Sequence, residues 1–363
     1  MRFRLLDLLI CPDCKNILHC DVLIKSKVDI SRQINISTCQ FWCAFHNVNL
    51  LESEAKITDC QACQEIEIID GILKCSCGKS YPVAGGIPRI LPPSLRPVEK
   101  KTARKFGYEW TKFSDYEVEN FAIFMKFLAP NFFCGKVGLD AGCGAGRHLV
   151  RLSDLGAEAI GFDLSNSVDV VYQKTFHLPG IHIVQCDVSY LPFRKDVFDF
   201  IYSLGMLHHL LDPNKGFKGL IPFLKPGSGT IFFLVYQRSL RKLLLEPIRA
   251  ITTRLPEEVV YWISSIAAIF DYGILGQRYH LLKEIPILGK IADLLTPRRV
   301  KEYSQYPFRV SIADWFDRLS APISRSYSQE EIKRWLESEH LADIRVSAID
   351  SSWIYGYGVR KNI

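Results

Sequence analysis

Hydrophobic positions between residues 137 and 236 form short apolar runs, each followed by apolar residues at helical spacing. A short apolar run bounded by turn residues is typical of a buried strand, and strands that alternate with helices predict a parallel sheet. The predicted strands are Val137–Asp140, Ala159–Asp163, His182–Asp187, Asp196–Ser203 and Thr230–Tyr236. The pattern therefore indicates an α/β fold.

The C-terminal residues continue this pattern after a long interruption. Ser328 followed by Glu331 is typical of a capping box and predicts a helix over 328–337. Two further predicted strands, Ile344–Ile349 and Trp353–Val359, bring the sheet to seven strands. Residues 237–325 are apolar and broken by prolines, so we expect a helical insertion after the fifth strand.

Prolines at positions 92, 93 and 97 mark a stiff linker after a cysteine-rich N-terminal segment. The aromatic residues that follow recur at helical spacing. The chain is therefore expected to divide into a cysteine-rich domain at 1–93, a linker with helices at 94–136, a strand-rich core at 137–236, a helical lid at 237–325, and a C-terminal helix with two strands at 326–363.

Composition and charge are those of a globular protein, with 48% hydrophobic and 23% charged residues. Much of the net charge of +6 lies in the insertion, because residues 237–310 hold 12 Lys/Arg against 7 Asp/Glu. No signal sequence is evident, and no apolar run reaches the ~18 residues of a spanning helix. The longest run, Val259–Phe270, predicts a buried or interfacial helix. We expect a soluble, cytoplasmic protein.

Nine of the 12 cysteines precede Lys79, mostly in closely spaced pairs. A C-x-x-C turn places two thiolates within reach of one tetrahedral zinc ion, and a second pair completes the site. We expect Cys11, Cys14, Cys75 and Cys77 to form one zinc site. The inserted Cys39, Cys43, Cys60 and Cys63 are candidates for a second, with His46 as a substitute ligand. Alternatively, some of these thiols pack as small buried hydrophobes.

Both ends of this segment carry recognisable motifs. L-x-x-L-I-C-P-D-C precedes the first cysteine pair, and Y-P-V and G-I-P follow the last. Together they resemble the zinc-ribbon-like domain related to the activator subunit of certain tRNA and protein methyltransferases. Relative to that pattern, residues 25–63 are an insertion.

A glycine-rich turn follows the first strand of the core. Gly142, Gly144 and Gly146 come after Asp140 and before a helical pattern, which suits close approach of a nucleotide-like ligand. Backbone N–H groups around Gly142 to Gly146 are expected to bind the anionic end of the ligand, as helix N-termini bind anions. Asp163, at the end of the second strand, is placed to accept hydrogen bonds from ribose hydroxyls. Asp187, at the end of the third strand, suits an adenine amino group.

This series resembles the class I S-adenosylmethionine-dependent methyltransferases of the small-molecule type. The resemblance covers D-x-G-C-G-x-G, the acid after strand two, D-x-x-x-L-P-F, F-D-x-I and M-L-H-H-L over residues 137–236. It implies a Rossmann-like seven-stranded methyltransferase sheet and S-adenosylmethionine as cofactor. The implied cofactor-binding residues are Asp140, Gly142, Cys143, Gly144, Gly146, Asp163, Leu164, Asp187, Val188 and Ser203.

Methyl transfer to oxygen requires a base to remove the proton of the acceptor. His208 and His209, just after the fourth strand, are the positional candidates, although this segment in similar families lines the pocket without catalysing a step. The substrate candidates are polar and aromatic residues that lie where the insertion rejoins the sheet: Tyr303, Tyr306, Arg309, Asp314, Asp317, Arg325 and Tyr327.

The expected acceptor is a small or lipid-linked metabolite, methylated at oxygen. N/D-P-P-Y/F after strand four and a Pro-Cys motif, which mark base amino and pyrimidine carbon methylation, are missing from the sequence. An RNA methyltransferase that uses its zinc domain for recognition and a non-catalytic cofactor-binding regulator stay open as alternatives. The basic, apolar insertion also suits peripheral contact with a membrane, a lid or a dimer face.

Overall fold

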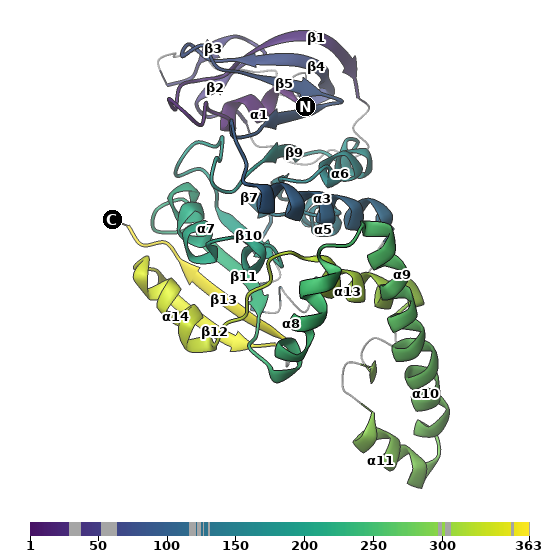
Figure 1. Ribbon diagram of the computed structural model, residues 1–363. Helices are drawn as coiled ribbons and strands as arrows, with labels where there is room; N and C mark the ends of the chain where they lie inside the picture. Colours follow the sequence, from purple (N-terminus) through teal and green to yellow (C-terminus); the bar gives the residue numbers. More distant parts are fainter. Residues whose placement is uncertain are drawn as a thin grey trace.

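The computed structural model describes residues 1–28, 38–51, 64–115, 121, 125, 127–129, 131–296, 300–301, 306–349 and 352–362, with the side chains of 240–243 left out. The N-terminal residues form a small, mainly antiparallel unit at one end of the molecule (Figure 1). Its elements are α1 (Phe3–Leu8), β1 (His19–Lys27), β2 (Trp42–Cys43), β3 (Val48–Asn49), β4 (Ile66–Lys74), β5 (Ser80–Ala84) and β6 (Ile87–Ile90).

The core alternates strands and helices as predicted. Its elements are β7 (Val137–Ala141), α5 (Arg147–Asp154), β8 (Glu158–Asp163), α6 (Ser167–Thr175), β9 (Ile181–Cys186), β10 (Phe200–Leu204), α7 (Pro213–Leu220) and β11 (Thr230–Tyr236). After the insertion come α14 (Gln329–Ser338), β12 (Ala342–Ala348) and β13 (Trp353–Val359). The predicted capping box of α14 is present, because Ser328 and Glu331 each bind the backbone N–H of the other.

The sheet is larger than predicted. Seven strands run in the order β9-β8-β7-β10-β11-β13-β12, parallel except for the contacts of β13. Beyond β9 the sheet continues through β6, β5, β4 and β1, so it has eleven strands. The join is a short parallel pairing of Arg89 with Gln185 and Ile90 with Cys186. The α/β, Rossmann-like class is confirmed, whereas the expected seven strands make up only one end of the sheet, from β9 to β12.

Buried charges fasten the N-terminal unit to the core. Arg4 pairs with Glu158 at 3.0 Å and with Asp7 at 2.5 Å, and these side chains are almost fully buried. Asp7 also accepts hydrogen bonds from three consecutive backbone N–H groups, at residues 40 to 42. Since a buried charge is tolerated only with partners, these pairs specify how the unit and the core fit together.

The helical insertion forms a lid and a projecting arm. Within the insertion, α8 (Leu240–Thr252) follows β11, and α13 (Phe308–Ser320) lies over the carboxyl ends of the strands. The helix α3 (Pro97–Lys112), which precedes the core, lies beside α13 over the same strand ends. The arm consists of α9 (Glu257–Ala268), a π-helical stretch (Ile269–Gly276), α10 (Gln277–Lys283) and α11 (Pro286–Leu295). It extends away from the rest of the protein, at the end opposite the N-terminal unit (Figure 1).

The arm differs from the sequence expectation in one respect. Its helical stretch Glu257–Lys283 is 27 residues long, with a mean hydropathy of 1.5 in its most apolar window. By length and composition alone it is sufficient to cross a membrane, although no apolar run by itself predicted this. The difference arises because the π-helical stretch continues the helix beyond Phe270, past Asp271.

Candidate functional site

A cavity of about 240 Å³ opens at the carboxyl ends of the central strands, beneath α3 and α13. In open α/β sheets this edge is where ligands bind. Eight of the predicted cofactor residues line it: Asp140, Gly142, Cys143, Gly144, Asp163, Leu164, Asp187 and Val188. These residues follow the ends of three strands, β7, β8 and β9, and together form one continuous wall of the cavity.

Gly146 and Ser203, also predicted to bind the cofactor, lie outside the described lining of this cavity. Gly146 is the N-terminal residue before α5, with φ of 72°, and a Cβ there would lie 2.4 Å from Val171 Cγ1. Ser203 is fully buried, and its hydroxyl donates to the Ala141 carbonyl at 3.0 Å. Both residues shape the turn and the strand that carry the cavity wall.

The glycine turn uses most of its own N–H groups. Those of Gly142 and Cys143 donate to the Phe162 carbonyl at 2.9 and 3.0 Å, and that of Gly144 donates to Asp163 Oδ2 at 3.1 Å. This corrects the expectation that these groups meet the anionic end of a ligand. Arg147, at the first turn of α5, lies in the lining and supplies a positive charge there instead.

Two carboxylates at strand ends have the placement expected for nucleoside recognition. Asp163 is only partly buried, and besides Gly144 it accepts from Ser165 N at 2.8 Å. Burial raises the pKa of Asp163, while the hydrogen bonds from Ser165 and Gly144 oppose the shift. Asp187 accepts from Ser189 N at 2.7 Å. Because a carboxylate offers about four acceptor sites, both retain capacity for ligand hydroxyl or amino groups.

Asp140 lies deeper in the cavity, 3% exposed, and accepts a hydrogen bond from the Tyr202 hydroxyl at 2.8 Å. Burial raises the pKa of Asp140 to about 7, and the Tyr202 hydrogen bond limits the rise. A cation bound nearby would favour the ionised form. On the opposite wall, the Trp110 ring lies against Gly144, where a Cβ would come within 3.0 Å of its Nε1.

The two histidines after β10 have different surroundings. His209 lines the cavity, and its Nδ1 lies 2.6 Å from the Ile323 carbonyl, so this nitrogen carries a proton. Its Nε2 lies 3.7 Å from Asp317 Oδ1. His208 is fully buried outside the described lining, and its ring packs on Tyr236 with a centroid separation of 4.1 Å. Of the pair, only His209 is placed to contact a ligand.

Acidic groups gather on the side of the cavity next to His209. Tyr236 donates its hydroxyl to Asp317 Oδ2 at 2.6 Å, and Asp314 lies one helical turn before Asp317 on α13. Glu109, on α3, also lines the cavity at 1% exposure, and its Oε2 has no hydrogen-bond partner among the described residues. Burial, together with the charges of Asp317 and Asp314, raises the pKa of Glu109 well above its usual value.

Sequence reasoning missed Glu109 as a residue of the cavity wall. Glu109 carried a signal, because Phe106, Glu109, Trp110 and Phe113 stand at positions i, i+3, i+4 and i+7 and therefore share one helix face. A single acid on an otherwise aromatic face indicates either a buried partner or a ligand. Asp314, by contrast, belongs to the polar and aromatic set expected to contact the acceptor, and α13 brings it to the cavity wall.

Of the predicted substrate residues, Asp314 and Asp317 of α13 are placed in the described lining. Arg309 pairs with Asp115 at 2.9 Å on the surface, and Arg325 donates to the Leu211 carbonyl at 3.0 Å. Tyr327 packs on Trp335 of α14, and burial raises its pKa to about 12. Tyr303 lies outside the described residues.

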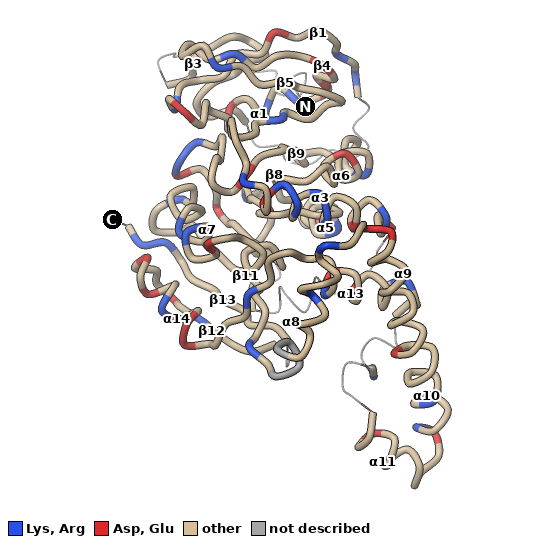
Figure 2. Tube along the Cα trace, in the orientation of Figure 1, with Lys and Arg blue, Asp and Glu red and all other residues tan. Residues whose placement is uncertain are grey.

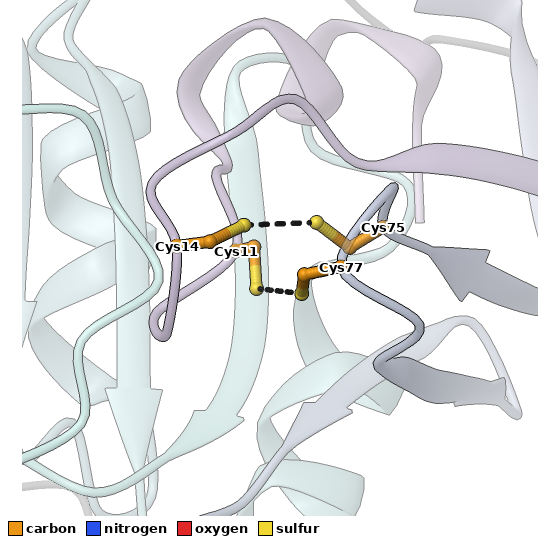
Figure 3. Close-up of side chains that lie close together, drawn as sticks. All are labelled: Cys11, Cys14, Cys75 and Cys77. Carbon is orange, nitrogen blue, oxygen red and sulfur yellow. Dashed lines mark hydrogen bonds between the residues drawn. The ribbon is translucent and has the colours of Figure 1, made fainter.

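Four cysteines converge in the N-terminal unit. The sulfur atoms of Cys11, Cys14, Cys75 and Cys77 all lie within 4.8 Å of one another (Figure 3), the closest pair being Cys14 and Cys75 at 3.2 Å. Thiolates bound to one zinc ion at 2.3 Å are about 3.8 Å apart, so this cluster has the dimensions of a four-thiolate site. Each pair stands on its own tight turn, as its spacing predicted.

The second set of cysteines is only partly described. Cys43 Sγ lies 3.2 Å from His46 Nδ1, and Cys39 is close enough to affect the Cys43 thiol, whose pKa is raised chiefly by burial. Cys60 and Cys63 lie outside the described residues.

Comparison with known proteins bears on the core. Residues 139–233 match the family model for a methyltransferase domain. The chain contains a methyltransferase domain. This confirms the resemblance to class I S-adenosylmethionine-dependent methyltransferases, and the predicted cofactor agrees with it.

Relatives of the methyltransferase domain have different names. A tRNA U34 carboxymethyltransferase of Campylobacter curvus is 29% identical over 43% of this chain and 53% of its own. A ubiquinone biosynthesis O-methyltransferase of Methylococcus capsulatus is 30% identical over 33% of this chain and 52% of its own. The chain thus spans about half the length of these relatives. An S-adenosylmethionine-dependent methyltransferase structure from Mesorhizobium loti is 25% identical over 34% of this chain and 55% of that chain, with a TM-score of 0.30.

Proposed function

We propose that the protein transfers the methyl group of S-adenosylmethionine to an oxygen atom of a small or lipid-linked acceptor. The observation that carries this proposal is that one cavity joins the cofactor-binding residues to the group around His209 and Asp317. In this proposal Asp163 and Asp187 hold the ribose and adenine, while Asp140 and Arg147 complement the charges of the methionine part. Bound S-adenosylmethionine supplies the methyl group and leaves as S-adenosylhomocysteine.

His209 is suited to act as the base. Because its Nδ1 donates to the Ile323 carbonyl, the neutral ring carries its lone pair on Nε2. The acceptor hydroxyl would give its proton to this nitrogen as its oxygen forms the bond to the methyl carbon and the carbon–sulfur bond breaks. The positive ring that results lies beside Asp317, whose carboxylate stabilises it. Orientation of the acceptor by the lid supplies the rest of the rate enhancement.

The charge of the cavity favours a neutral acceptor group over a phosphate-rich one. Even without Glu109, whose pKa is raised by burial, five carboxyl groups stand against one arginine among the described lining residues. A polyanion such as RNA would be repelled from such a surface unless other residues compensate. RNA methylation is nevertheless the second candidate, because one relative is named as a tRNA-modifying enzyme.

We further propose that Cys11, Cys14, Cys75 and Cys77 hold a structural zinc ion. The cluster adjoins the loop after β9, since Tyr81 lies 3.7 Å from Cys11 Sγ and 3.2 Å from the Tyr190 hydroxyl. Tyr190 is three residues beyond Asp187, so the metal would brace the segment that holds the adenine. Such a site fits the predicted cytoplasmic setting, where thiols stay reduced.

A labelling experiment tests the proposed acceptor class. Protein is incubated with radiolabelled S-adenosylmethionine and a cell lysate, and the products are separated into RNA, protein, lipid and small-molecule fractions. We expect label in the lipid or small-molecule fraction, lost in His209→Gln and retained in the neighbouring variant His208→Gln if that variant folds. Label in RNA alone would contradict the proposal and support the second candidate.

Metal analysis tests the zinc proposal. We expect at least one zinc ion per chain in protein purified without chelators, and weaker binding of S-adenosylhomocysteine after the metal is removed. Cys14→Ser should lower the zinc content, whereas Cys134→Ser, which changes an exposed cysteine of the core, should leave it unchanged. A zinc content well below one per chain would refute the site.

A further inference from the structure

The distal part of the arm, residues 273–295, has little contact with the rest of the protein, because Asp271 and Tyr272 before it still contact Trp315 and Phe308 of α13. At its base, Val260 and Ala268 of α9 belong to one buried apolar cluster with Phe316 of α13. Beyond Ala268, the residues buried within the arm are small ones such as Gly276, Gly289 and Ala292, where the helices pack on one another. Large apolar side chains are therefore left on the outside.

More than half of the exposed large hydrophobic residues among the described residues lie on the arm. The most exposed are Leu281 at 74%, Ile287 at 75%, Leu294 at 84% and Leu295 at 75%. Their carriers, α10 and α11, form the tip of the arm (Figure 1). An apolar surface of this size is not maintained in water without a partner.

The tip helix α11 is amphipathic. Ile287, Ile291, Leu294 and Leu295 stand at positions i, i+4, i+7 and i+8, which form one stripe along the helix. Gly289 and Ala292 occupy the side that is buried, and Lys290 and Asp293 occupy the remaining side. Lateral insertion of such a stripe into the boundary between headgroups and acyl chains is how interfacial helices bind.

Length argues against a spanning arrangement. The proximal half of the stretch Glu257–Lys283 packs on α13, and Asp271 and Tyr272 also contact that helix, so the free part begins near Gly273. From Gly273 to Lys283 the helix covers about 16 Å at 1.5 Å per residue, which is less than the ~30 Å of a bilayer core. The helix then turns back at Pro286 into α11. The free part is therefore long enough to enter a membrane surface and too short to cross it.

Charge specifies the kind of surface. The distal arm and the residues that follow it, 273–301, contain six Lys/Arg and two Asp/Glu in the sequence, and three of the six are Arg298, Arg299 and Lys301 after the arm. Within the described residues, Lys283 and Lys301 are near acids of the arm, whereas Arg278 and Lys290 form no ion pair. Figure 2 shows the few charges of the arm scattered among long uncharged stretches. Basic groups beside an apolar stripe complement anionic lipid headgroups.

We infer that the distal arm seats the protein on an anionic lipid bilayer, with the apolar side chains of α10 and α11 inserted at the interface. This goes beyond the proposed methyl transfer, because membrane binding requires neither cofactor nor catalysis. It also gives the arm a place in the whole molecule. Its base packs on α13, which carries Asp314 and Asp317 of the cavity wall, so the arm connects the proposed membrane contact to one wall of the cavity.

Vesicle flotation tests this inference with the full chain. Wild-type protein should float with vesicles of phosphatidylcholine and phosphatidylglycerol, and less with phosphatidylcholine alone or at high salt. The triple variant Ile287→Ser, Leu294→Ser, Leu295→Ser should lose about tenfold or more of its binding, because those side chains no longer insert. The variant Arg278→Glu, Lys290→Glu should lose the preference for the anionic lipid.

The matched control replaces three exposed apolar residues at the other end of the molecule, Leu23→Ser, Ile24→Ser and Leu51→Ser, and should bind vesicles like the wild type. The thermal unfolding midpoint of each variant shows whether it folds. Wild-type protein that fails to float, or an arm variant that floats unchanged, would overturn the inference. A stable dimer that becomes monomeric in the arm variant, without vesicle binding, would assign the arm to a second copy of the chain instead.

Discussion

Asp163→Ala is expected to weaken binding of S-adenosylhomocysteine by roughly a hundredfold. The carboxylate stands at the end of β8, partly exposed to the cavity, and the proposal gives it both ribose hydroxyls. Hydrogen bonds to a charged group contribute about 1.5 kcal/mol each at the lower end of their range, which applies here because solvent reaches the site. Two of them amount to about 3 kcal/mol, or two powers of ten in Kd.

The same substitution also removes the acceptor of the Gly144 N–H, so two effects must be separated. Asp163→Asn keeps an oxygen in place and should preserve the turn while losing the charge. We expect intermediate affinity for Asn, large loss for Ala, and little change for Asp169→Ala, a half-exposed acid on α6 outside the described lining. Calorimetric titration measures the Kd of each variant. Thermal unfolding without ligand measures how much stability is lost when the Gly144 N–H loses its acceptor.

The reasoning is refuted by either of two results. Wild-type protein that does not bind S-adenosylhomocysteine would remove the basis of the proposed function. An Asp163→Ala variant that binds within about threefold of the wild type would show that the carboxylate makes no net contribution to cofactor binding.

Three further predictions concern groups within or below the cavity. Because burial raises the pKa of Asp140 to about 7, the affinity for S-adenosylhomocysteine should fall as the pH drops from 8 to 6, by at most about tenfold per pH unit. Calorimetry should show no such fall in the variant Asp140→Asn. The raised pKa of Glu109 favours its protonated form in the folded protein, so its contribution to folding stability is complete below the pKa of the unfolded state and is lost as the pH rises. Urea titrations should therefore show that Glu109→Gln becomes more stable relative to the wild type as the pH increases from 5 to 8. Gly146→Ala should lower the free energy of unfolding by about 1–3 kcal/mol, because its φ is 72° and the new Cβ meets Val171; an unchanged melting temperature would contradict this.

The sequence by itself determined the elements of the methyltransferase core. The positions of Asp163 and Asp187 at strand ends could be predicted because buried parallel strands have continuous apolar sequences. The carboxyl ends of such strands lie at one edge of the sheet, so the two side chains were expected at the same site. The capping box at Ser328 and the cysteine pair at Cys11 and Cys14 are equally local. Each depends on residues a few positions apart, so spacing alone specifies their geometry.

Only the tertiary structure decided what meets across the cavity and what remains uncovered. Glu109 and Asp317 are over two hundred residues apart, and their proximity follows from the packing of α3 and α13 over the sheet. Asp317 and Arg309 lie on the same helix, α13, and both were predicted to contact the substrate. Asp317 lines the cavity, whereas Arg309 forms an ion pair on the surface. Apolar spacing likewise predicted helices in the insertion but not that Leu294 lies exposed, because burial is a property of long-range contacts that no local pattern records.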